Sequence, residues 1–183
     1  MKTPQSPFIA LGLATLGLLA PGSARALDPT HDKILYMIAT AHLDDQWNWT
    51  IQDTINSYIP NTLRQNFAYF TNANYTNYTF TFEEAWRYQL MKEYYPAEYE
   101  RVRQYAREGR WKVAGSWVDA VDTHVPSSES LIRHALYGNG FFRRELGQTS
   151  RDVFLPDCFG FGYALPSVAA HTGLFAFSTQ KLT

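Results

Sequence analysis

Two short segments of the chain carry residue types that could bind a metal ion and attack a substrate. In the first segment, His42 and Asp44 stand two residues apart within residues 41–47. On an extended backbone their side chains point to the same side and can reach one metal ion, whereas Asp45 points the other way. Zinc accepts histidine nitrogen and carboxylate oxygen together. A bare His-x-Asp pattern also occurs in solvated loops, so it needs a second signal.

The second segment places an aspartate beside a glycine-rich, aromatic turn. Asp157 follows the apolar run at residues 153–155 and precedes the sequence CFGFG at residues 158–162. Glycines let the backbone turn tightly and leave room for a ligand. On local sequence, Asp157 could equally cap the next helix. Cys158 is better interpreted as a small packed residue than as a nucleophile, because no neighbouring base can be assigned to it.

The remaining histidines and the aromatic residues have simpler interpretations. His124 falls in a predicted loop, and His134 and His171 fall within predicted helices, where a structural role is the simpler interpretation. Aromatic residues are concentrated between Trp47 and Trp117. They could stack on sugar rings, but a large core would use them just as readily.

Strands that alternate with helices would bring the polar candidates to one edge of a parallel sheet. Apolar runs predict four strands, at Ile34–Ala39, Lys112–Val118, Val153–Leu155 and Phe175–Thr179. His42, Asp44, Asp157 and Lys181 each follow the end of one of these strands. In parallel barrels and doubly wound sheets, that edge carries the active site. The pattern therefore predicts an α/β fold with a site at the carboxyl ends of its strands.

Helices are predicted between these strands, at residues 81–109, 127–146 and about 165–171. Thr81 with Glu84 has the form of a capping box at the start of the first segment. Pro96 divides that segment into two consecutive helices. Gly147 closes the second segment.

Composition excludes several classes of function. The 183 residues are 45% hydrophobic and 16% aromatic, which is enough to bury a core and excludes a disordered chain. The formal net charge of −1, with no basic block, gives no sign of a nucleic-acid partner or of an anionic membrane surface. A single cysteine excludes an intramolecular disulfide framework and a Cys-rich zinc site. Any metal must therefore be held by histidine and carboxylates.

Residues 1–26 are predicted to form a signal peptide that is cleaved near Ala26. Lys2 supplies the positive end, Phe8–Ala20 forms the apolar stretch, and Ala24-Arg25-Ala26 has the small-x-small form of a cleavage site. The apolar stretch is short for a bilayer span, and an uncleaved anchor is the alternative. The mature chain, residues 27–183, is expected to be secreted or periplasmic and free of the membrane.

Taken together, the segments resemble glycoside hydrolase family 38, the α-mannosidases, over about residues 34–182. The first block, AHLDDQW at 41–47, is similar to the family's His-x-Asp-x-x-Trp motif. The central block and the nucleophile block follow in order, as GRW (109–111), GSWV (115–118), PSSESL (126–131), LPDCFG (155–160), LP (165–166) and TQKL (179–182). Two departures occur, because Lys181 stands where many members have Arg and Ser128 stands where Gly is frequent.

The resemblance implies the family's N-terminal domain, a seven-stranded parallel β/α barrel-like fold that this chain would leave incomplete after about four strands. One Zn²⁺ per site is implied. The implied site residues are the zinc ligands His42, Asp44 and Asp157, the nucleophile Asp157, and the sugar contacts Trp47, Phe159 and Lys181.

The implied activity is the hydrolysis of terminal α-D-mannosides in an oligosaccharide or glycan, with retention of configuration. Asp157 would form a covalent glycosyl-enzyme, and a second carboxylate about 5–5.5 Å away would act first as acid and then as base. In the family that carboxylate and a fourth zinc ligand come from later strands, so the 183-residue chain is expected to be an inactive fragment.

Two alternatives remain open from the residues. A polysaccharide deacetylase-like hydrolase would also use Asp and His near strand ends, with a metal-activated water. A secreted carbohydrate-binding protein would use the aromatic cluster without any turnover. The sequence indicates neither the linkage specificity nor the oligomeric state.

Overall fold

The computed structural model describes residue 28 and residues 30–181, and the chain divides into two units at Tyr36/Met37. The predicted signal peptide lies outside the described residues. In the first unit, the described residues form a turn in which the backbone and hydroxyl of Thr30 donate hydrogen bonds to Asp28 Oδ1, at 2.9 and 2.6 Å. Among the described residues, no helix combines the length and apolar character that a membrane crossing requires.

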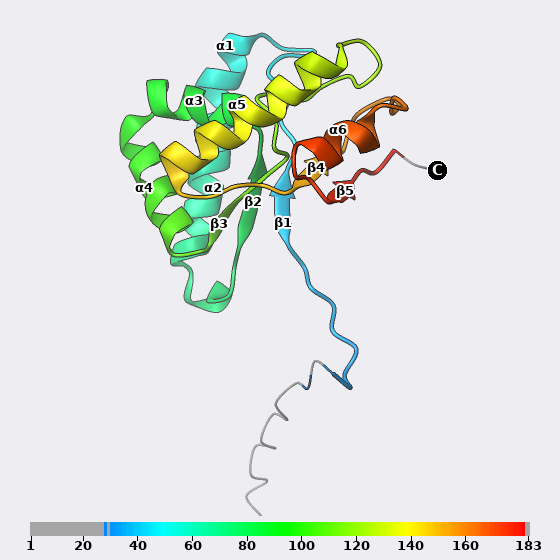
Figure 1. Cartoon of the computed structure of the whole chain (residues 1–183). Coiled ribbons are helices and arrows are strands. Elements are labelled where there is room, and N and C mark those ends of the chain that lie inside the picture. The colour runs from blue at the N-terminus through cyan, green and yellow to red at the C-terminus, as the bar shows by residue number, and fades with distance from the viewer. Residues whose placement is uncertain (1–27, 29, 182–183) are drawn as a thin grey trace, which may run out of the picture. The chain divides into compact units, whose positions relative to one another are not determined.

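The second unit carries the helices and strands that are labelled in Figure 1. Its strands form two parallel sheets, one with the order β1-β2-β3 and one that pairs β4 with β5. In chain order, its elements are β1 (Ala39–Ala41), α1 (Ile51–Asp53), a π-helical stretch (Thr54–Tyr58), α2 (Ile59–Thr71), a 3-10 turn (Ala73–Tyr75), β2 (Phe80–Glu83), α3 (Ala85–Tyr94), α4 (Pro96–Arg107), β3 (Trp111–Ala114), α5 (Ser128–Leu146), β4 (Asp152–Phe154), α6 (Leu165–His171) and β5 (Ala176–Ser178).

The register of the parallel strands places the ends of β1 and β2 side by side. Ala41 pairs with Phe82, so His42, which follows β1, lies next to Glu83, the last residue of β2. The end of β3 approaches β4 at Ser116, whose N and Oγ donate hydrogen bonds to Asp152 O at 3.4 and 3.1 Å. The predicted parallel α/β architecture is therefore confirmed. The described residues show two parallel sheets, and closure into a barrel remains a prediction.

Local sequence sets several helix ends. Thr50 and Asp53 cap each other at the start of α1, since Asp53 N donates to Thr50 Oγ1 and Thr50 N donates to Asp53 Oδ2. Ser127 caps α5, and Gly147 ends it with a left-handed φ of 66°. α4 begins at Pro96, which confirms that two helices occupy the segment predicted to be interrupted there.

Two sequence predictions about elements are wrong. The first strand begins at Ala39 instead of Ile34, and the apolar side chains of residues 35–38 are exposed. Thr81 lies within β2 and does not cap a helix, and Glu84 at the start of α3 makes no capping hydrogen bond. Phe80 and Phe82 of β2 are buried in the core, and this burial outweighs the capping pattern.

Residues 51–71, for which no element is predicted, form α1, the π-helical stretch and α2. Their threonines, asparagines and Pro60 have low helix propensity. Tertiary packing decides the helix instead, because α2 buries an apolar stripe formed by Ile59, Leu63, Phe67 and Phe70.

Two groups of buried apolar residues form the core, and α5 contributes to both of them. Leu131 of α5 packs with residues of β4 and α6, whereas Phe142 packs with α2, β2, α3 and α4. In the larger group, Trp111 Nε1 donates to the Tyr88 hydroxyl, which donates to the Phe82 carbonyl, both at 2.9 Å. The core interpretation is therefore confirmed for these aromatic residues.

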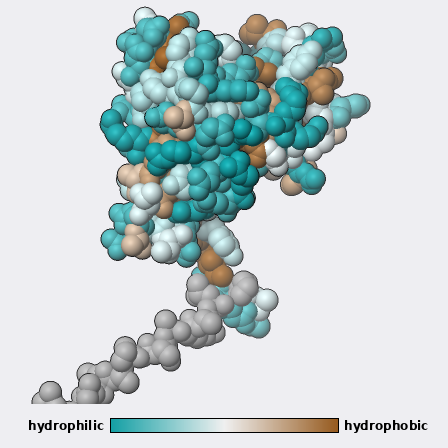
Figure 2. Space-filling model, turned by 90° about the vertical axis from the view of Figure 1, so that its left-hand side faces the viewer, coloured by the Kyte–Doolittle hydropathy of each residue, from teal (hydrophilic) through white to brown (hydrophobic). Residues whose placement is uncertain are grey.

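The side of the molecule on which α3 and α4 lie is mostly hydrophilic, and hydrophobic residues show there only as small separate patches (Figure 2). α4 explains this pattern. It buries Tyr99, Val102 and Ala106, at intervals of three and four residues, and exposes the charged residues Glu100, Arg101 and Arg107.

Candidate metal centre

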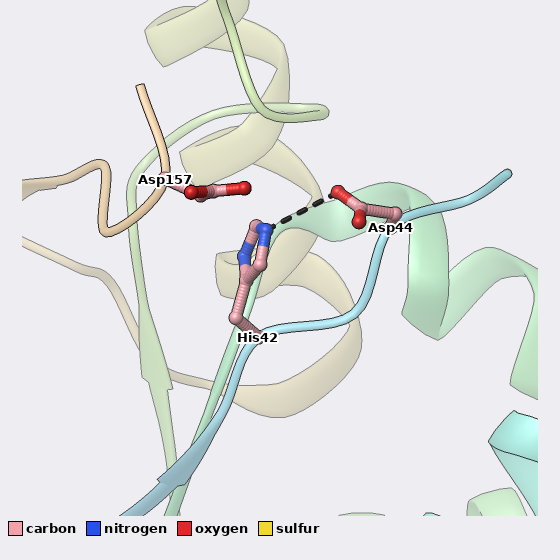
Figure 3. Close-up of side chains that lie close together, drawn as sticks. All are labelled: His42, Asp44 and Asp157. Atoms are coloured by element: carbon pink, nitrogen blue, oxygen red, sulfur yellow. Dashed lines mark ion pairs between the residues drawn. The ribbon is translucent and has the colours of Figure 1, made fainter. Parts of the chain in front are cut away.

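Three side chains meet at the carboxyl edge of the strands. His42 and Asp44 follow β1 and Asp157 follows β4, and one ligand atom from each lies within 4.8 Å of the others. His42 Nε2 lies 3.2 Å from Asp44 Oδ1. Figure 3 shows the imidazole between the two carboxylates. One imidazole nitrogen with two carboxylate oxygens is a donor set that zinc accepts, so the residues predicted as ligands fit the ion.

A hollow of about 210 Å³ opens beside this cluster. Its walls come from three loops that follow strands β1, β3 and β4, namely His42 with Asp44, residues 120–122 and residues 155–159. The side chains of Asp44 and Asp157 are each 36% exposed, so a ligand in the hollow can reach both carboxylates.

His42 is held from behind by a buried carboxylate. Its Nδ1 makes a hydrogen bond to Oε1 of Glu83, whose side chain is fully buried. This hydrogen bond raises the pKa of His42 to about 9, although partial burial of the imidazole opposes the shift. Nε2 is left to face Asp44.

Asp157 is paired with Lys181, which follows β5. Lys181 Nζ lies 2.5 Å from Asp157 Oδ1 and 4.8 Å from the centre of the Phe159 ring. The hydrogen bond from Lys181 lowers the pKa of Asp157. The site therefore keeps this carboxylate ionised, as a nucleophile or a metal ligand requires.

The turn after Asp157 is fastened to the loop that follows β3. Thr123 Oγ1 donates to Gly160 O and accepts from Gly162 N, both at 3.0 Å. Gly160 has a φ of 152°, and a Cβ on it would lie 2.5 Å from His124 Cε1, so only glycine fits there. Cys158 is buried, and its Sγ contacts the Gly160 carbonyl, in agreement with the predicted packing role.

A buried guanidinium holds the metal-binding segment from its other side. Arg87 Nε donates to the carbonyl of Leu43 at 2.7 Å, between the two candidate ligands of that segment. Arg87 also pairs with Glu84, with Asp119 at 2.5 Å and with Asp45 at 3.7 Å. As predicted, Asp45 does not join the metal cluster. Burial raises the pKa of Asp45 to about 7 and that of Glu84 to about 8.

Sequence reasoning missed the two residues that support this segment, Glu83 and Arg87. Two adjacent acidic residues after the apolar run of β2 were the available signal, because acidic side chains are rarely placed beside a core without partners.

The predicted sugar contacts are placed differently from one another. Phe159 lines the hollow and is 86% exposed. Trp47 is also exposed, but it does not line the hollow and packs edge-on against Trp49, with ring centres 5.8 Å apart. The remaining histidines have local contacts or partial burial; for example, His171 Nδ1 contacts the Ser167 carbonyl within α6.

The chain is similar in sequence to known proteins over most of its length. Residues 33–183 match the glycosyl hydrolases family 38 N-terminal domain. Alpha-mannosidase G of Dictyostelium discoideum is 35% identical over 154 residues, which cover 81% of this chain and 13% of that protein. Alpha-mannosidase 2C1 of Homo sapiens is 30% identical over 143 residues, covering 78% of this chain and 13% of that protein.

A solved structure shows the same fold. The crystal structure of an alpha-mannosidase from Enterococcus faecalis V583 aligns with a TM-score of 0.68 and 20% identity, covering 78% of this chain and 16% of that chain. The chain therefore spans well under a quarter of the length of the proteins it matches.

Proposed function

Because the chain belongs to glycosyl hydrolase family 38, we propose that it forms part of a zinc-dependent, retaining α-mannosidase. The observation that carries this proposal is the convergence of His42, Asp44 and Asp157 beside an open hollow. The relatives that are named alpha-mannosidases support mannose-containing glycans as the substrate class.

His42, Asp44 and Asp157 would hold the metal ion, with zinc as the proposed ion. When bound, zinc supplies Lewis-acid binding of neighbouring sugar hydroxyls, and the axial 2-hydroxyl of mannose suits that contact. Around the ion, the chain contributes a fixed imidazole, two carboxylates and the supporting contacts from Glu83 and Arg87.

Asp157 is the proposed nucleophile. One of its oxygens would bond to the anomeric carbon as the glycosidic C–O bond breaks and the leaving oxygen takes a proton from a second carboxylic acid. Water would then attack the anomeric carbon, return a proton to that second carboxylate and free Asp157. Family resemblance assigns the second carboxylate to a later part of the sequence. Lys181 keeps Asp157 ionised for the attack.

Phe159, which lines the hollow, and Lys181, which lies beside Phe159 and Asp157, are proposed sugar contacts. The exposed ring of Phe159 offers an apolar face to the sugar, and Lys181 offers hydrogen bonds above it. Trp47 is proposed as a contact at a greater distance from the hollow. We also propose that the protein is secreted or periplasmic and that its signal peptide is cleaved near Ala26.

The test is turnover of a chromogenic α-mannoside by the complete protein, meaning the polypeptide translated from the whole open reading frame that contains these residues. Asp157→Asn should lower kcat by at least about a thousandfold, because the amide is a poor nucleophile. Glu100→Gln, at an exposed position of α4, is the control that should keep full activity. Removal of metal with a chelator should abolish turnover, and zinc should restore it.

The rival functions give different results in the same experiment. A deacetylase-like enzyme would leave the mannoside intact and release acetate from an acetylated oligosaccharide. A carbohydrate-binding protein would bind mannosides without turnover, and Asp157→Asn would leave that binding almost unchanged.

Proton NMR of the first-formed sugar would show the α-anomer if configuration is retained.

A further inference from the structure

Glu83 has an unusual environment for an acidic side chain. It is the last residue of β2, its side chain has no exposed surface, and its Oε1 contacts His42 Nδ1 from 41 positions along the chain. In the part of the chain that the structure describes, His42 is its single ion-pair partner. Burial of a carboxylate is unfavourable unless it is paired, so this position has to be explained by its contact with His42.

The backbone sets this contact, and the neighbouring residue is turned away from it. Because Ala41 pairs with Phe82, His42 leaves the end of β1 next to Glu83, the last residue of β2. Glu84 then has a φ of 64°, a left-handed conformation that side-chain-bearing residues rarely adopt. Its carboxylate pairs with Arg87 instead. The two adjacent buried acidic residues therefore pair with different residues, Glu83 with His42 and Glu84 with Arg87. Substitution of Glu84 is thus a matched control for substitution of Glu83.

The two nitrogens of the His42 imidazole have different partners, as expected of a histidine that binds a metal ion through one nitrogen and is held by a hydrogen bond at the other. One nitrogen of His42 is engaged by Glu83, and the other lies 3.2 Å from Asp44 Oδ1, at the metal cluster. A histidine that binds a metal usually donates its other N–H to a carboxylate or carbonyl, which fixes the tautomer and the ring orientation. Here the acceptor is a carboxylate that is fully buried and comes from a different strand.

We infer that Glu83 is a positioning residue that accepts a hydrogen bond from His42 Nδ1–H and so presents Nε2 as the metal-binding nitrogen. This inference rests on the proposed metal site. Glu83 does not belong to the group of ligand atoms itself. Substitution of Glu83 should therefore change the metal affinity and the geometry of the bound ion more than it changes sugar binding.

The experiment measures zinc affinity of the complete protein by competition with a chromophoric chelator. Glu83→Ala should bind zinc about 10–100-fold more weakly. Glu83→Gln should fall between this variant and the unaltered protein, because its amide oxygen still accepts from Nδ1–H but carries no charge. Glu84→Gln, the adjacent buried acid that faces Arg87, should bind zinc within about threefold of the unaltered protein.

A second measurement separates positioning from folding. Cobalt in place of zinc should give an altered visible absorption spectrum in Glu83→Ala and an unaltered one in Glu84→Gln. Urea denaturation of the metal-free variants reports the stability of each fold independently of the ion. If Glu83→Ala does not fold, Glu83→Gln and Glu83→Asp provide the same comparison with a retained acceptor.

The outcomes distinguish the inference from the proposed function. If the unaltered protein binds one zinc ion, His42→Ala loses it, and Glu83→Ala and Glu83→Gln bind as tightly as before, the inference is wrong and the metal site stands. If the unaltered protein binds no zinc, both the site and the role of Glu83 are overturned. Equal losses in the Glu83 and Glu84 variants would also overturn the inference, because general damage would explain them.

Discussion

Lys181 Nζ lies 2.5 Å from Asp157 Oδ1, so the proposed metal ligand and nucleophile already has a cationic partner. The ammonium also lies over the Phe159 ring. A metal ion that is bound by Asp157 would stand close to this positive charge, and like charges repel. Lys181 therefore favours the ionised carboxylate but opposes the cation that the carboxylate is proposed to bind.

Lys181→Met should tighten zinc binding by about threefold to tenfold, because it removes the opposing charge and frees an oxygen of Asp157. Chelator competition on the complete protein measures the change. Lys112→Met, which removes an exposed lysine of β3, is the control and should leave the affinity unchanged. Weaker binding in Lys181→Met would show that Lys181 supports the ion.

Gly138→Ala should destabilise the fold, because α5 passes very close to the loop after β3 at this residue. A Cβ on Gly138 would lie 2.3 Å from Ser116 O and 2.5 Å from Trp117 O, and neither backbone atom can move aside easily. The expected loss in the free energy of unfolding is about 1–3 kcal/mol or more, measured by urea denaturation.

The control for that change lies two residues further along α5. A Cβ on Gly140 would meet only the end of the Arg144 side chain, at 3.2 Å. Gly140→Ala should therefore be neutral or stabilise the helix by about 0.5–1 kcal/mol. Equal effects of the two substitutions would contradict the close approach at Gly138.

Thr123→Val should loosen the turn that follows the proposed nucleophile. Valine has the shape of threonine but lacks the hydroxyl, so Gly160 O and Gly162 N lose the partner they share. The expected loss is about 1–3 kcal/mol of unfolding free energy, together with a higher KM for an α-mannoside. Thr123→Ser keeps both hydrogen bonds and should cost less, so a serine variant as damaged as the valine variant would refute this role.

Glu84→Gln should change how stability depends on pH. The pKa of Glu84 is raised by burial from 4.5 to about 8, so between these values the folded state binds more protons than the unfolded state. Stability contributed by this group is thus fully present below pH 4.5 and is lost as pH rises through about 8.

The substitution should make the fall in unfolding free energy with pH less steep, by up to about 1.4 kcal/mol per pH unit. Urea denaturation of the metal-free protein at several values between pH 5 and pH 8 measures the slope. Parallel curves for the two proteins would mean that Glu84 stays ionised beside Arg87 across this range.

Elements whose signals are local were predictable from the sequence. Pro96 divides α3 from α4, and Ser127 and Gly147 set the two ends of α5, as predicted. β2 and α2 were not predictable in this way. Each depends on burial against elements that are distant in the sequence, and burial overrides the local capping pattern in β2 and the weak helix propensity in α2.

For the candidate site, too, some features were predictable from the sequence and others depend on the tertiary structure. The residue types in the AHLDDQW and LPDCFG segments determined, without any structure, which donors could meet an ion and that they follow strand ends. The tertiary structure alone decided that Glu83 stands behind His42, that Arg87 holds Leu43 and that Lys181 pairs with Asp157. These contacts depend on strand register and loop packing between distant segments, and a linear pattern of residue types does not specify either one.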